Sequence, residues 1–135
     1  MTRDDFQRIA LSLPESAEGE HLRTRDFRVR NRIFATFGPR DPRLGVVKLT
    51  PDQQDVLCSS EPTIFAPIPG GWGRKGWTHV TVDAADEATL RSALTMAWGN
   101  VAPKKLLLLL KRHSGEMEKP EILAANAEKI RKALS

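Results

Sequence analysis

The stretch FRVRNRIFATFGPRDPRLGVVKL, residues 27–49, contains three short runs rich in β-branched and aromatic side chains. Turn-favouring residues separate these runs, first Arg30 and Asn31 and then the segment from Gly38 to Pro42. Strands that are joined by such short connections pair with their neighbours in the antiparallel direction. The stretch therefore predicts an antiparallel meander, and it decides the fold class.

Helix signals flank this meander. Thr2, with Asp5 three residues later, matches an N-terminal cap and predicts a helix over residues 3–12. Thr50 precedes a first-turn proline and predicts a second, short helix. An apolar stripe at helical spacing predicts a third helix over residues 86–99. Together these elements predict an α+β fold in which helices pack on an antiparallel sheet.

The remaining elements are shorter or more apolar. Residues 63–65 and 77–82 read as further strands, the second with clear alternation. Pro103 can begin a helix that contains the five consecutive leucines 106–110. That helix is apolar around most of its circumference, so we expect its centre to be buried against the domain or a partner. A last helix is predicted over residues 120–134.

The length of 135 residues suits one domain with a sizeable core. We expect residues 1–113 to form the α+β domain and residues 114–135 to form a helical extension packed on it. No apolar run approaches the roughly 20 residues that span a bilayer, and the N-terminus lacks a secretory signal. Cys58 is the only cysteine, which excludes an internal disulfide. These features predict a cytoplasmic protein with no membrane partner.

The net charge of +4 is distributed unevenly along the chain. Residues 21–32, 70–82 and 101–113 together carry ten positive charges in excess, so the other residues carry six negative ones. If the three basic segments share a face, that face attracts polyanions. Guanidinium groups contact phosphates through paired donors, and hairpins can approach a duplex backbone. We expect phosphate contacts from Arg28, Arg30, Arg32, Arg74, Lys75, Lys104 and Lys105. The alternative is a solvated strand face whose charges prevent edge-to-edge association.

The stretch GGWGRKGW, residues 70–77, is the other unusual feature, and its composition is that of a surface loop. Glycine permits close backbone approach, and tryptophan supplies a flat apolar face. Trp72 and Trp77 can stack on bases or on a flat ligand, with core packing as the alternative. The glycine spacing fits neither a Walker loop nor a dinucleotide fingerprint. A small-molecule or peptide-binding domain built on this loop, or an interaction module built on the leucine-rich helix, are alternative functions.

Catalytic and metal-binding patterns are absent from the sequence. His21, His79 and His113 lie far apart and show no metal-ligand spacing. No activated nucleophile or paired carboxylate set can be assembled from adjacent motifs, and Cys58 reads as an inert helix residue. We therefore expect no enzymatic activity, no metal and no cofactor.

Short motifs follow one another in a fixed order between residues 3 and 112. They are Leu13-Pro14-Glu15, Phe27-Arg28-Val29, Phe34-Ala35-Thr36, the GGWGRKGW stretch, Ala97-Trp98 and Val101-Ala102-Pro103-Lys104-Lys105. This set resembles the MmcQ/YjbR-like proteins. The resemblance implies a small bacterial α+β domain, a fold similar to the frataxin and CyaY group, and DNA binding by a double-wing arrangement.

The sequence departs from the family pattern at residues 30–32, where the usual glycine-rich turn is replaced by charged side chains. A frataxin-like fold raises the possibility of iron handling. However, the first helix offers only Asp4 and Asp5, and hard cations prefer clustered carboxylate oxygens. The combined expectation is a monomer, with a dimer as the alternative, that binds double-stranded DNA through phosphate contacts.

Overall fold

Six strands form one antiparallel sheet in the computed structural model, which describes residues 1–38, 40–41 and 43–108. Their order across the sheet is β1-β2-β3-β4-β6-β5, so four consecutive strands form a meander and the last two exchange places. The α+β class and the antiparallel meander predicted from residues 27–49 are therefore confirmed. The strands are β1 (Ser16–His21), β2 (Thr24–Val29), β3 (Arg32–Phe37), β4 (Leu44–Lys48), β5 (Phe65–Pro67) and β6 (Trp77–Thr81).

The strand β1 was not predicted, because its sequence SAEGEH is poor in strand-forming residues. It forms by pairing along the edge of β2, from Ser16 opposite Val29 to His21 opposite Thr24. Cross-strand pairing thus overrides a weak local preference, as is common for strands.

Two-residue turns with left-handed backbone join β1 to β2 and β2 to β3. Leu22 and Arg23 have φ of 47° and 63°, and Arg30 and Asn31 have φ of 50° and 66°. Positive φ at both central residues is the signature of the type I′ hairpin turn. Successive turns of a meander lie at opposite ends of the sheet, so the first basic segment is divided in space. Arg23 lies at one end of the sheet, and Arg30 lies at the other.

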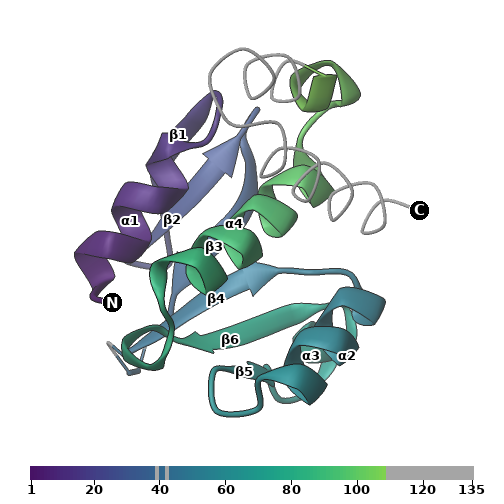
Figure 1. The fold of residues 1–135 in the computed structure, drawn as a ribbon. Coiled ribbons are helices and arrows are strands. Elements are labelled where there is room, and N and C mark those ends of the chain that lie inside the picture. The colour runs from purple at the N-terminus through teal and green to yellow at the C-terminus, as the bar shows by residue number, and fades with distance from the viewer. Residues whose placement is uncertain (39, 42, 109–135) are drawn as a thin grey trace.

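The first two helices begin where capping residues were predicted, and Asp86 caps the third long helix. Thr2 and Thr50 each form a capping box with the side chain three residues later, and Asp86 accepts a hydrogen bond from the Thr89 amide at 2.7 Å. The helices are α1 (Arg3–Ser12), α2 (Pro51–Ser60), α3 (Gly71–Arg74) and α4 (Glu87–Val101), with a 3₁₀ turn η1 at Val82–Ala84. Figure 1 shows α1 and α4 side by side on one face of the sheet, while α2 and α3 lie next to β5 and β6.

Three phenylalanines join α1 to the sheet. The ring centroid of Phe6 on α1 lies 6.1 Å from that of Phe27 and 5.3 Å from that of Phe37, and all three side chains are buried. A β-carbon at Gly45 on β4 would overlap the ring of Phe6. The absence of that carbon lets the helix approach the sheet closely, and the three rings form part of the hydrophobic core.

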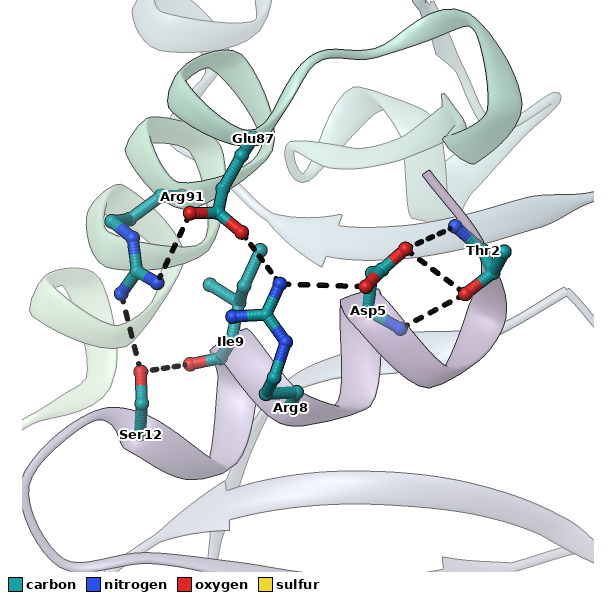
Figure 2. A network of polar contacts seen from close by, with 7 residues as sticks. All are labelled: Thr2, Asp5, Arg8, Ile9, Ser12, Glu87 and Arg91. Carbon is teal, nitrogen blue, oxygen red and sulfur yellow. Dashed lines mark hydrogen bonds and ion pairs between the residues drawn. The ribbon is translucent and has the colours of Figure 1, made fainter.

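A polar network joins the exposed sides of α1 and α4 (Figure 2). Arg8 donates to Glu87 at 2.5 Å, and the Arg91 guanidinium lies 4.0 Å from the same carboxylate. Arg91 also donates to the hydroxyl of Ser12 at 3.3 Å. Because all these groups are exposed to solvent, the network orients the two helices but contributes little to stability compared with the apolar core.

The leucine-rich segment is helical over the residues that are described, 104–108. Leu106 is buried, Leu107 is partly buried against the core and Leu108 is exposed. The predicted burial therefore holds for the first of these leucines. Leu109, Leu110, the helix predicted at 120–134 and the extension predicted at 114–135 lie outside the described residues. Within the described part of the chain, no helix is long and apolar enough to cross a membrane.

We predict that Gly76→Ala destabilises the fold by at least about 2 kcal/mol, because Gly76 has φ of +106° and an added β-carbon would overlap the Leu49 carbonyl oxygen. Gly71→Ala is the matched control, since its β-carbon meets the Arg74 guanidinium at 3.7 Å, an ordinary contact. The control should stay within about 0.5 kcal/mol of wild type in urea unfolding. Equal stabilities for the two variants would contradict the packing described here.

Candidate nucleic-acid interface

The Gly/Trp stretch is more ordered than the irregular loop that its composition predicted. Residues 71–74 form a single helical turn, α3, which leads directly into β6. A β-carbon at Gly73 would overlap the carbonyl oxygen of Ile68, and one at Gly76 would overlap that of Leu49. These two glycines are therefore required by close backbone packing, and they fix the path of the chain between them.

The side chain of Gln54 on α2 fixes the backbone of this stretch by hydrogen bonds. Its buried side-chain amide donates to the carbonyl oxygens of Gly73 and Trp77 at 3.0 and 3.2 Å, and to the Thr78 hydroxyl at 3.0 Å. The hydroxyl of Thr78 in turn donates to the Gly76 carbonyl at 2.9 Å. Sequence reasoning missed Gln54, because a glutamine in a short helix carries no signal of a contact about 20 residues away.

Two lysines and two tryptophans form a cluster on this support. The Nζ of Lys48 lies 5.4 Å from the ring centroid of Trp77, and the Nζ of Lys75 lies 5.4 Å from that of Trp72. The two indoles meet edge to face, with centroids 6.3 Å apart and an interplanar angle of 72°. Such ammonium–indole contacts are favourable because the ring face carries negative potential.

The two ammonium groups of the cluster are close enough to repel each other. Lys48 Nζ donates to the backbone carbonyl of Lys75 at 2.6 Å. Burial, and then the charge of Lys75, lower the pKa of the Lys48 ammonium. An anion bound at this site would therefore reduce the repulsion between the two ammonium groups.

The strand register brings the basic residues of three segments to one end of the sheet. Lys48 pairs with Trp77 at the end of β4, and Ala35 pairs with Val47, so the start of β3 lies toward that same end. Asn100 near the end of α4 donates to the Lys48 carbonyl at 2.9 Å, so the segment after α4 starts beside the end of β4. We call this the basic end, and it contains Arg32, Lys48, Arg74, Lys75, Lys104 and Lys105.

The residues of the basic end make no ion pair with a carboxylate that the structure describes. Two of the arginines elsewhere on the sheet do. The guanidinium of Arg25 lies 3.1 Å from the carboxylate of Glu18, and that of Arg30 lies 3.1 Å from that of Glu15. Five of the residues predicted to contact phosphate thus belong to the basic end: Arg32, Arg74, Lys75, Lys104 and Lys105. Arg30 lies next to the basic end, but its charge is already compensated by Glu15. Lys48 is an addition that charge counting by segment missed.

Arg28 is placed differently from the other predicted residues. Its guanidinium donates to both carboxylate oxygens of Asp26, at 2.7 and 2.9 Å, and to the Glu20 carbonyl at 3.2 Å. His21 Nδ1 lies 2.8 Å from the same carboxylate, which is completely buried. Gly19 leaves the space that this network fills, since a β-carbon there would meet both Asp26 and Arg28.

The network keeps Asp26 ionised in the interior. Burial raises the pKa of the Asp26 carboxyl, but the hydrogen bonds and charge of Arg28 and His21 outweigh it and hold that pKa below its usual range. Arg28 thus compensates a buried charge, and its phosphate-binding role stays a prediction.

A shallow hollow of about 710 Å³ lies away from the basic end, between α1 and the β1–β2 hairpin. Its walls carry both signs of charge, and Arg25 is already bound there to Glu18 and Gln7. A surface with compensated charges attracts no polyanion. The hollow therefore does not compete with the basic end as a nucleic-acid site.

Groups with other chemistry are dispersed. No cluster of three or more histidine, cysteine or acidic side chains fit to hold a metal occurs among the residues described. Burial, and then Asp55, raise the pKa of the Cys58 thiol, which keeps it protonated. Burial lowers the pKa of His79, which is consistent with a neutral strand residue.

Comparison with known proteins identifies the family. The YjbR family model matches residues 11–100, about two thirds of the chain. The chain belongs to the YjbR family. This YjbR protein is also similar to the crystal structure of the Deinococcus radiodurans protein DR2400, which has a DUF419 domain. The two share 26% identity over 74% of this chain and 78% of the other, with a TM-score of 0.62. No curated protein matches the sequence.

The matched region contains the Asp26 network, Gln54 and the Gly/Trp stretch. The predicted resemblance is therefore confirmed for the part of the chain that forms the sheet and the cluster of Lys48, Lys75, Trp72 and Trp77. Lys104 and Lys105 lie just beyond the matched residues.

We predict that Arg28→Ala lowers the Tm of this YjbR protein by on the order of 10 °C, because it leaves the Asp26 carboxylate buried with one partner fewer. Arg32→Ala, a neighbouring and exposed arginine, is the control and should leave Tm unchanged. Calorimetry of both variants checks this.

The effect of Arg28→Ala should also depend on pH. The Asp26 pKa is lower in the folded state, so the stabilisation is complete above the unfolded pKa of about 4 and is lost as the pH falls through the folded value. The difference in Tm from wild type should therefore narrow in acid. A difference that stays constant down to acid pH would show that the ion pair is not its cause.

Proposed function

We propose that this YjbR protein binds nucleic acid, foremost double-stranded DNA, through phosphate contacts at the basic end. The observation that carries the proposal is the convergence of cations from three separate segments on one end of the sheet, without carboxylate partners among the described residues. Arg25, Arg30 and Arg43, in contrast, each lie next to a carboxylate. Uncompensated cations gathered at one place give a local potential that attracts a polyanion.

The composition of the basic end favours contacts with phosphate. Arg32 and Arg74 can offer paired donors to a phosphate group, while the lysines act as point charges. Contacts of this kind fix position on a duplex but carry no sequence information. We therefore propose modest sequence preference and a strong dependence of affinity on salt concentration.

The β2–β3 hairpin supplies one edge of the proposed interface. Its tip has left-handed backbone at Arg30 and Asn31, and Arg32 follows at the start of β3. The segment after α4, with Lys104 and Lys105 exposed, adds further cations to the interface. In this proposal the hairpin acts as one wing of a double-wing mode of binding.

We also propose that the protein binds without catalysing a reaction. The protonated Cys58 thiol is not poised as a nucleophile. The close His21–Asp26 pair is occupied by Arg28, which holds the carboxylate in a structural ion pair. Neither group lies at the basic end, where the bound phosphates would be.

We predict that the triple variant Arg32→Ala, Lys75→Ala, Lys104→Ala weakens binding to a duplex and lowers the slope of log K against log salt by about 2 to 3. The reason is that each lost phosphate contact releases about one counterion fewer. Fluorescence anisotropy of a labelled duplex between about 50 and 200 mM salt measures both quantities.

The matched control removes the same net charge elsewhere, with Arg23→Ala, Arg25→Ala and Arg43→Ala. These residues lie at the opposite end of the sheet, at the β1–β2 tip, near the start of β2 and just before β4. Affinity and slope should stay near the wild-type values. If the two triple variants weaken binding equally, net charge and not the basic end determines affinity, and absence of wild-type binding at the lower salt would reject the function.

A further inference from the structure

The Gly/Trp stretch contains residues that the fold requires and residues that it does not. Gly73 and Gly76 are required by backbone packing, and Gln54 anchors the carbonyls of Gly73 and Trp77. Trp77 is half-buried at the start of β6. Trp72, in contrast, has 63% of its surface exposed, and its neighbour Lys75 is exposed as well.

The exposure of Trp72 has no structural explanation. An indole is the largest apolar side chain, and leaving it in solvent forgoes burial that would stabilise the fold. Its packing partners are the edge of Trp77 and the ammonium of Lys75, both within the same short stretch. The backbone that follows Trp72 is nevertheless held in place, because Gly73 packs on the Ile68 carbonyl and the Gln54 amide donates to the Gly73 carbonyl.

The charges around Trp72 indicate the kind of ligand that fits. Lys75 and Lys48 flank the two indoles, and Arg74 is the next exposed cation. None of these three cations pairs with a carboxylate in the described parts of the chain. A flat aromatic face with uncompensated cations beside it suits a ligand that is itself flat at one end and anionic at the other.

We propose that Trp72 stacks an unpaired nucleobase of a nucleic-acid strand, while Lys48 and Lys75 bind the phosphates next to that base. The inference rests on the proposed nucleic-acid binding and names the part of the ligand that this cluster recognises. Base stacking on an aromatic side chain tolerates any sequence, because every base has a π-face. The duplex phosphates bound by the rest of the basic end would continue into a strand whose terminal or extruded base lies on Trp72.

The cluster of Lys48, Lys75, Trp72 and Trp77 is positioned for a nucleic-acid strand that leaves a duplex. It lies on the side of the basic end next to β6 and α2, away from the β2–β3 hairpin. Arg32 is on β3 and Lys75 lies just before β6, with β4 between these two strands. A backbone that passes from the hairpin side toward Trp72 therefore crosses the cations of both sides.

The test compares wild type with Trp72→Ala and Trp72→Phe. Anisotropy is measured with a labelled oligothymidylate of about 12 nucleotides and with a blunt duplex of similar length, at about 50 mM salt. Trp72→Ala should weaken binding to the single strand about tenfold or more, change duplex binding less than about twofold, and leave Tm unchanged. Trp72→Phe should recover most of the single-strand affinity, because a phenyl ring can still stack.

Several results would overturn the inference without affecting the proposed function. One is equal single-strand affinity of Trp72→Ala and wild type; another is an equal loss of affinity for single strand and duplex. Complete competition by thymidine monophosphate at the concentration of the oligonucleotide would assign the site to a free nucleotide instead. Absence of wild-type binding to both nucleic acids would reject the proposed function itself, and the inference with it.

A membrane surface is the other partner that an exposed tryptophan beside lysines suggests. Vesicles of phosphatidylserine and phosphatidylcholine, added without nucleic acid, test it directly. A blue shift of tryptophan emission that is lost in Trp72→Ala would assign the cluster to anionic lipid and overturn the stacking proposal. An unchanged emission spectrum, together with the single-strand result above, supports it.

Discussion

The close approach of two backbone segments at Gly76 is the constraint on which the basic end depends. The Leu49 amide donates to the Gly76 carbonyl at 3.1 Å, and a β-carbon at Gly76 would overlap the Leu49 carbonyl oxygen. This contact joins the end of β4 to the start of β6, two strands separated by α2, β5 and α3. It places Lys48 next to Lys75 and sets both indoles at the rim of the sheet. A change in this backbone contact would therefore alter both the pairing of β4 with β6 and the candidate site.

Arginine has two different roles in this domain, and they depend on whether the arginine is paired with a buried carboxylate or is exposed to solvent. Arg28 neutralises a carboxylate that is completely buried, so its donors are engaged before any ligand arrives. Arg32 is exposed at the start of the neighbouring strand and has no described carboxylate partner. A buried ion pair is costly to break, whereas an exposed cation can exchange its hydration for a phosphate at little cost. The same residue type thus supports the fold at one position and is available for binding at a position four residues later.

The sequence predicted the class of fold because its local signals agree with the tertiary structure. The capping residues Thr2 and Thr50 begin two of the helices, and the β-rich runs between Phe27 and Leu49 form the meander. β1 escaped prediction because its stability comes from pairing with β2 and not from its own residues. The candidate site was predicted in part. Charge along the chain located the basic segments, but only the register showed that Arg23 and Arg30 lie at opposite ends, and only packing reveals the contact of Gln54 with Gly73.

The most direct test of binding at the basic end is an NMR titration of the ¹⁵N-labelled protein with a short duplex that carries a single-stranded overhang. The three tryptophan indoles report separately. Trp98 is an internal reference, because it is buried and its indole nitrogen donates to the Pro14 carbonyl at 3.0 Å. We predict shifts for the Trp72 indole and for the amides around Arg32, Lys75 and Lys104, with the Trp98 indole unmoved. Shifts confined to the β1–β2 hairpin around Arg23, or no shifts at low salt, would contradict binding at the basic end.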